Sequence, residues 1–133
     1  MSRLIIFLLL ISSCFANVGN EVSAVIAGRA GYFAGTVRGN SMKGYYNNGD
    51  TVIIKAVDFK NIRIGQVVVY SNRFGEIVVH RVEEKCEFGF RVRGSNNKGN
   101  DSTILDSDNL IGVVYGVIHE RGEFRQLLAC AQK

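Results

Sequence analysis

The feature that most constrains the fold is a series of short runs rich in valine and isoleucine, bounded by glycine, asparagine or aspartate. The runs are YFAGTVRG (32–39), TVIIKAV (51–57), GQVVVYSN (65–72), GEIVVHRVEEKC (75–86), GFRVRGS (89–95) and NLIGVVYGVI (109–118). β-Branched residues favour strands, and turn formers at this spacing favour several short strands over any helical fold. We therefore predict a mainly β fold of bent antiparallel sheets that form a small, partly open barrel.

The turns must rely on glycine and asparagine, because the chain has 15 glycines and no proline. The 75–86 run is predicted to pair with the 65–72 run across the short turn NRFG. Helix is confined to the N-terminal portion and, as an open alternative, the end of the chain. The segment NNKGNDSTILDSDN (96–109) is a long polar loop, and such loops in compact domains tend to carry function.

Composition and charge exclude some classes of protein. The 133 residues suffice for one compact domain, with 47% hydrophobic and 21% charged residues. The formal charge of +4 comes from scattered basic residues, and no DNA-reading motif accompanies them, so nucleic acid is not an expected partner. A mild attraction to anionic lipid remains open.

The N-terminal stretch MSRLIIFLLLISSCFA (1–16) has the layout of a secretory leader: one positive charge, an apolar run, then small residues. The apolar run is shorter than the roughly 20 residues of a spanning helix. Three outcomes stay open: cleavage after Ala16, lipid attachment at Cys14, or retention as a short anchor. We expect residues 17–31 to be a linker and 32–133 to form a domain that is exported or faces the outside of the membrane.

The cysteines and histidines do not form a metal-binding pattern. If Cys14 leaves with the leader, Cys86 and Cys130 remain, and they form either one disulfide or two separate buried thiols. There is no CxxC, and neither cysteine has metal-ligand spacing with His80 or His119. We therefore expect no metal and no cofactor.

A serine in RGNSMKGYY, Ser41, raises the question of whether a base is available to it, since an unassisted hydroxyl is a poor nucleophile. Of the two histidines, His119 ends the last predicted strand and looks peripheral. His80 shares one face of its strand with Val78 and Val82 and so points towards apolar surroundings. It is either satisfied by a neighbour in the core or kept neutral as a base, and periodicity alone favours the structural reading.

Aspartates of the polar loop are candidates for the third member of a triad. Asp101 could orient and stabilise an imidazolium, and Asp106 and Asp108 are further candidates. Taken singly, each is more typical of a turn-forming residue.

The order of the motifs along the chain is more specific than any one of them. GNSM, GDTVII, GQVVVY, VVHRV, RVRGSNNKGNDS and LIGVVYGVI follow one another as in type I signal peptidases. The sequence most closely resembles the branch of the endoplasmic reticulum, archaea and some Gram-positive bacteria, related in fold to LexA-type serine peptidases. The resemblance covers about residues 35–118. It implies Ser41 as nucleophile, His80 as general base where most bacterial members have lysine, and Asp101 as the acidic partner.

The resemblance further implies a serine endopeptidase that cleaves leader peptides of exported proteins after a small residue, at or near a membrane surface. Residues 32–133 would then be the catalytic domain. Main-chain groups near Ser41, at Gly39 and Asn40, would stabilise the oxyanion and contact the substrate. Met42 would line the floor of the substrate pocket, although it is equally a candidate core methionine. The partners would be preproteins or leader peptides. The oligomeric state is left open.

Three departures from the family pattern stand beside the matches. Gly44 occupies the place of a proline, Gln66 that of an aspartate, and Ser95 that of an aspartate thought to support the active site. The departures at Gly44 and Ser95 support the alternative of a non-catalytic exported β domain that binds peptide or lipid. A processing peptidase for one dedicated partner is a further alternative. LexA-type self-cleaving repressors use a lysine base and carry a DNA-binding domain, where this chain has His80 and an export leader.

Overall fold

The fold is mainly β, as predicted, and the computed structural model describes residues 29–119 and 124–126. The strands are β1 (Tyr32–Thr36), β2 (Thr51–Lys55), β3 (Val67–Ser71), β4 (Ile77–Cys86), β5 (Gly89–Arg93), β6 (Leu110–Ile118) and β7 (Phe124–Gln126). Each of the six predicted runs contains one of the strands β1 to β6. Neither β7 nor a single 3-10 turn, η1 (Phe59–Asn61), was expected from the sequence.

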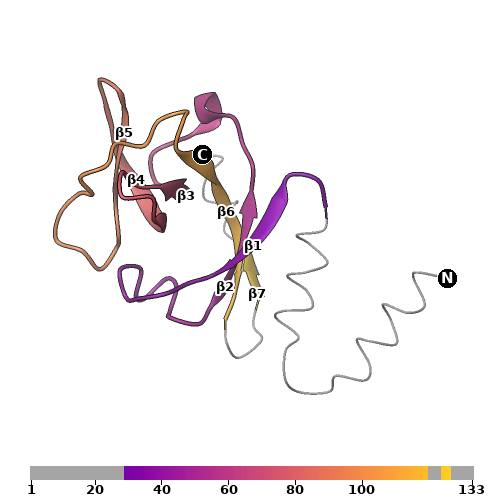
Figure 1. The fold of residues 1–133 in the computed structure, drawn as a ribbon. Helices are drawn as coiled ribbons and strands as arrows, with labels where there is room; N and C mark the ends of the chain where they lie inside the picture. The colour runs from indigo at the N-terminus through magenta and orange to yellow at the C-terminus, as the bar shows by residue number, and fades with distance from the viewer. Residues whose placement is uncertain (1–28, 120–123, 127–133) are drawn as a thin grey trace, which may run out of the picture.

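All the strands join one antiparallel sheet in the order β1-β2-β6-β3-β4-β5, with β7 paired to β6 (Figure 1). β3 and β4 form the predicted hairpin, in which Val68 lies opposite His80. The register shifts in three pairings: β2 with β6, β3 with β6, and β4 with β5. Such irregularities bend a sheet, and among the described strands the sheet stays open between its edges β1 and β5.

The bent sheet buries both faces of its central strands. One apolar cluster includes Val69 of β3 and a second includes the adjacent Val68, and successive residues of a strand point to opposite faces. This explains why β3 reads as the continuous apolar run VVVY rather than as an alternating pattern. The core therefore lies on both sides of the strand that neighbours His80.

The predicted polar loop is only partly exposed. Leu105 is fully buried and forms an isolated bridge with Phe90 of β5. The bridge ties the segment between β5 and β6 to the sheet and holds its first half, which carries Asp101, close to β4.

Several expectations concern residues outside the described ranges. These are the leader (1–16) with Cys14, most of the linker (17–31), the alternative of helix at the end of the chain, and Cys130. Cys86 is half-buried and forms no disulfide with any residue of the described part. Over the same ranges, no helix has the length and apolarity that crossing a membrane requires.

Candidate active site

Ser41 lies in a tight turn just after β1. The N–H of Lys43 donates to the Asn40 carbonyl at 3.1 Å, and the N–H of Tyr46 donates to the Met42 carbonyl at 2.9 Å. From the other side, the N–H of Asn96 donates to the Ser41 carbonyl at 2.8 Å. The serine is therefore held by its own turn and by the segment that follows β5.

His80 points from β4 into the interior, on the face predicted from the sequence, and only 8% of it is exposed. Its Nε2 lies 3.0 Å from the Ser41 Oγ, across 39 positions of sequence. Its Nδ1 contacts Asp101 Oδ2. Of the two readings left open for this histidine, the structure places it between a hydroxyl and a carboxylate rather than among apolar side chains alone.

Asp101 reaches His80 because its own main chain is anchored to the sheet. The Asp101 N–H donates to the Val92 carbonyl of β5 at 2.8 Å. The other two candidate aspartates lie elsewhere in the loop: Asp106 Oδ1 accepts the N–H groups of Asp108 and Asn109 at 2.9 Å and 3.0 Å. Asp106 is thus a turn former, and the structure brings only Asp101 of the three to His80.

The order of these contacts fixes the proton positions that a neutral imidazole would have. An ionised carboxylate only accepts hydrogen bonds, so Nδ1 of His80 carries the proton that faces Asp101. Nε2 is then left with a lone pair directed at the Ser41 hydroxyl. In this arrangement an imidazole can take the hydroxyl proton, and the charge that it acquires is stabilised by the carboxylate.

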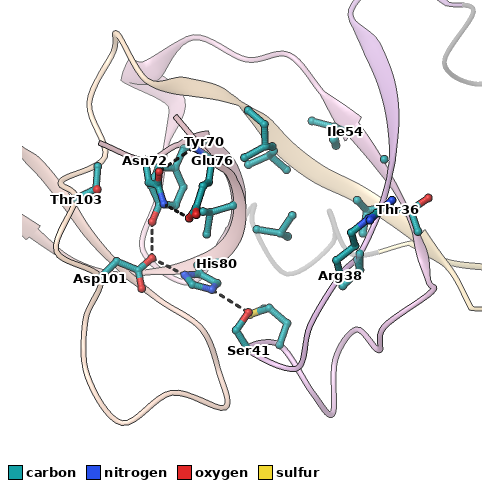
Figure 2. Close-up of a pocket in the computed structure, with 18 of the residues that line it drawn as sticks. Thr36, Arg38, Ser41, Ile54, Tyr70, Asn72, Glu76, His80, Asp101 and Thr103 are labelled. Atoms are coloured by element: carbon teal, nitrogen blue, oxygen red, sulfur yellow. Dashed lines mark hydrogen bonds and ion pairs between the residues drawn. The ribbon is translucent and has the colours of Figure 1, made fainter. Parts of the chain in front are cut away.

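A cavity of about 620 Å³ lies beside the three residues. Figure 2 shows Arg38 and Thr36 on one wall, Glu76 and Asn72 on the opposite wall, and Ser41 next to His80 between them. Apolar side chains of the central strands, among them Val52, Ile54, Val69 and Val79, complete the lining. The candidate nucleophile thus faces a space of the size of a small-molecule or peptide site.

The three residues expected to help bind the substrate have different surroundings. The Gly39 N–H already donates to Asn48 Oδ1 at 3.0 Å, so it is not available to an oxyanion in this conformation. The Asn40 carbonyl accepts from Asn96 Nδ2 at 3.0 Å. Met42 is 2% exposed, belongs to the core and also lines the cavity, so both readings of this methionine describe it.

The N–H groups of Ser41 and Met42 are the remaining candidates for oxyanion donors. Within residues 29–119 and 124–126, no acceptor pairs with either group. Two adjacent main-chain donors beside a nucleophile are a common way to stabilise a tetrahedral oxyanion.

The departures from the family pattern have local explanations at two of three positions. Gly44 adopts φ of +100°, a value that the proline ring forbids, so this turn is built differently from the proline-containing one. Gln66 accepts the Arg63 N–H at 2.8 Å and so closes a turn. The Ser95 hydroxyl is buried and has no hydrogen-bond partner among the described residues, and nothing in the structure explains that substitution.

Sequence reasoning missed three residues around the site. Tyr70 donates its O–H to Asp101, but in the sequence it only ends an apolar run. Asn96 holds the nucleophile turn through its main chain and its side chain. A Cβ on Gly94 would lie 2.6 Å from the Ser41 carbonyl oxygen, which only a glycine avoids.

His119, the second histidine, does not line the cavity. Its Nδ1 contacts Oδ2 of the buried Asp50 at 2.8 Å. In the described part of the chain, no group of three or more histidine, cysteine or acidic side chains is arranged to hold a metal ion.

Residues 18–115, well over half of the chain, match the family model described as Peptidase S24-like. No curated protein matches the chain.

Proposed function

Because the chain belongs to the Peptidase S24-like family and is thus a serine peptidase by family, we propose that Ser41, His80 and Asp101 are its catalytic residues. We propose further that it cleaves leader peptides from exported proteins. The observation that carries the first proposal is the 3.0 Å separation between Ser41 Oγ and His80 Nε2. This distance is within the reach that proton transfer between a nucleophile and its base requires.

In the proposed reaction, His80 Nε2 takes the Ser41 proton as Oγ attacks the carbonyl carbon of the scissile peptide. Asp101 stabilises the resulting imidazolium. The tetrahedral intermediate collapses when His80 gives the proton to the leaving amine, which breaks the C–N bond and leaves an acyl group on Ser41. Water, activated by the same histidine, then releases the acyl group and regenerates the serine.

The negative charge that develops on the carbonyl oxygen needs hydrogen-bond donors. We assign this role to the main-chain N–H groups of Ser41 and Met42, in place of the expected group at Gly39. The two donors lie on the nucleophile turn, to which Asn96 hydrogen-bonds and against which Gly94 packs closely. These contacts keep the donors in place before the substrate arrives.

The substrate would bind as an extended strand. Among the described strands, β1 pairs only with β2. Residues 35–38 at the end of β1 line the cavity opposite residues 76–80. An extended peptide that enters between these two segments can hydrogen-bond to main chain on either wall, as in other strand-addition complexes. Its side chains next to the scissile bond would meet Met42, Val52 and Ile54.

The choice of leader peptides as substrates rests on two features of the sequence. The motifs follow the order found in signal peptidases, with His80-Arg81-Val82 at the base position. The stretch 1–16 has the layout of an export signal, so the catalytic domain would act on the outer side of a membrane, either anchored there or secreted. Within this proposal, a peptidase for one dedicated partner and a general signal peptidase share the same chemistry.

A non-catalytic peptide-binding domain is the second candidate, because the Gly44 and Ser95 departures and the cavity are compatible with binding alone. Purified full-length chain, offered a preprotein in detergent or lipid, separates the candidates. We expect cleavage after a small residue, abolished by Ser41→Ala and by His80→Ala, and unchanged by Ser107→Ala at an exposed turn serine. Binding of the preprotein without cleavage would favour the second candidate, and cleavage that survives Ser41→Ala would remove that residue from the mechanism.

A further inference from the structure

Tyr70 extends the line of contacts beyond Asp101. Its hydroxyl donates to Asp101 Oδ2, the same oxygen that faces His80 Nδ1. Figure 2 shows the tyrosine behind the aspartate, on the side away from Ser41. The carboxylate oxygen that would support the base is thus held between two donors from neighbouring strands, β3 and β4.

The tyrosine is itself rigidly placed. It is 1% exposed and packs in the second apolar cluster with Val68, Val82 and Leu105. The ring also lines part of the cavity, but a side chain packed this deeply in a core does not change rotamer freely. The position of the hydroxyl is therefore set by the core, and the orientation of the Asp101 carboxylate is set by the hydroxyl.

The hydroxyl also remains a donor at any pH at which a peptidase would work. Burial raises the pKa of Tyr70 far above its usual value, and the hydrogen bond to Asp101 and the charge of that carboxylate raise it further. Tyr70 therefore keeps its proton, and Asp101 keeps its partner.

We infer that Tyr70 is a positioning residue for catalysis: it orients the Asp101 carboxylate so that Oδ2 meets His80 Nδ1. This inference rests on the proposed function of the three residues. A loop aspartate has two rotatable side-chain bonds, and a carboxylate that turns away leaves the imidazole free to adopt the wrong tautomer. The tyrosine removes that freedom before substrate binds.

Tyr70→Phe deletes the hydroxyl and keeps the ring, and Tyr46→Phe is a matched control. Tyr46 is equally buried, but its hydroxyl has no hydrogen-bond partner among the described residues. With a fluorogenic leader peptide and full-length chain, we expect Tyr70→Phe to lower kcat about tenfold, the effect of losing one hydrogen bond to a charged group. KM should change less than about twofold, since Tyr70 acts through Asp101, and Tyr46→Phe should match the unaltered chain.

A double-mutant cycle distinguishes positioning from a general loss of packing. In an Asp101→Asn background, Tyr70→Phe should change kcat less than about twofold, because the carboxylate that it orients is gone. An equal loss in both backgrounds would overturn the inference, as would a Tyr70→Phe variant indistinguishable from Tyr46→Phe.

Proton NMR gives a readout that needs no turnover. A His80 Nδ1–H bonded to a fixed carboxylate should give a low-field resonance that moves upfield and broadens in Tyr70→Phe but not in Tyr46→Phe. An unchanged or further downfield resonance in Tyr70→Phe would contradict the positioning role. If the resonance responds as expected but no peptide is cleaved, the proposed function fails while the positioning of Asp101 by Tyr70 stands.

Discussion

The protein contains two histidine–aspartate pairs with similar chemistry and different surroundings. His80 and Asp101 have side-chain exposures of 10% and 16%, and His119 and Asp50 have 21% and 3%. Each pair joins a histidine Nδ1 to an aspartate Oδ2 across a long stretch of sequence. Among the residues that the structure describes, only the His80 pair has a serine hydroxyl on its other ring nitrogen and a cavity beside it.

The difference lies in what each aspartate holds. Asp50 precedes β2, and its Oδ2 also accepts the Asn47 N–H at 2.8 Å. This carboxylate therefore stabilises the turn that connects the Ser41 segment to β2. Asp101 holds a side chain of β4 and a tyrosine of β3. A histidine–aspartate pair is therefore not in itself a catalytic signature, and the cavity and the hydroxyl decide between a structural tie and a candidate active site.

The largest expected difference between the two pairs is in activity. His80→Ala should lower kcat for leader-peptide cleavage by about 10⁴-fold or more, because the loss of the base of such a triad removes most of the catalysis. His119→Ala should leave activity per folded molecule within about twofold. The measurement is steady-state kinetics with the folded fraction determined by circular dichroism, and equal losses in both variants would erase the distinction.

The geometry behind Ser41 gives the second-largest effect. A Cβ at Gly94 would lie 2.9 Å from the Ser41 Cβ, whereas one at Gly99 would meet nothing within 4 Å. Gly94→Ala should therefore shift the serine and lower kcat by about 10²-fold, the usual result of a displacement near 1 Å, and Gly99→Ala should not. The same kinetic assay tests both variants, and activity retained in Gly94→Ala would show that the turn tolerates the displacement.

The third effect is on stability and belongs to the His119 pair. His119→Ala removes a hydrogen-bond partner from the buried carboxylate of Asp50, so the free energy of unfolding should fall by about 1–3 kcal/mol. Urea denaturation followed by circular dichroism measures it. An unchanged midpoint would mean that the pair does not tie β6 to the nucleophile segment.

The smallest expected effect concerns a charged side chain at the wall of the cavity beside His80, a cavity that His119 does not line. Glu76 lines one wall and accepts a hydrogen bond from Asn72, and no ion pair links it to another described residue. Glu76→Gln should lower kcat/KM about two- to threefold for a peptide with lysine near the cleavage site, and leave a neutral peptide unaffected. Exposed charges interact weakly and are screened, so the difference should shrink at high salt, and a salt-independent effect would contradict this origin.

The strands were predictable because their signals are local. Valine and isoleucine runs bounded by turn formers located all the strands from β1 to β6, and alternation placed His80 on an inward face with Val82. The 3-10 turn at 59–61 was missed because a single short turn leaves no periodic pattern. The polar composition of residues 96–109 concealed Leu105, whose burial depends on a bridge to another strand.

The candidate site was predictable only in part, since its contacts join distant positions. No local pattern says which partner meets an inward histidine, and only the motif order suggested Ser41 and Asp101. Tyr70 follows a run of valines and was read as part of that apolar run. Its hydroxyl partner, Asp101, lies 31 positions further on, so no local pattern reveals the contact. The Gly39 N–H was predicted as an oxyanion donor, but it donates to Asn48 Oδ1, a contact nine positions away that no local pattern indicates.

If Ser41 is the nucleophile, it becomes acylated during the reaction, and mass spectrometry of the acid-quenched chain detects the acyl group. With an activated ester of a leader-like peptide, for which acylation is faster than deacylation, we expect one acyl group on the fragment that contains Ser41, and none in Ser41→Ala. An acyl group on another residue, or ester turnover that persists in Ser41→Ala, would contradict the role of Ser41 as nucleophile.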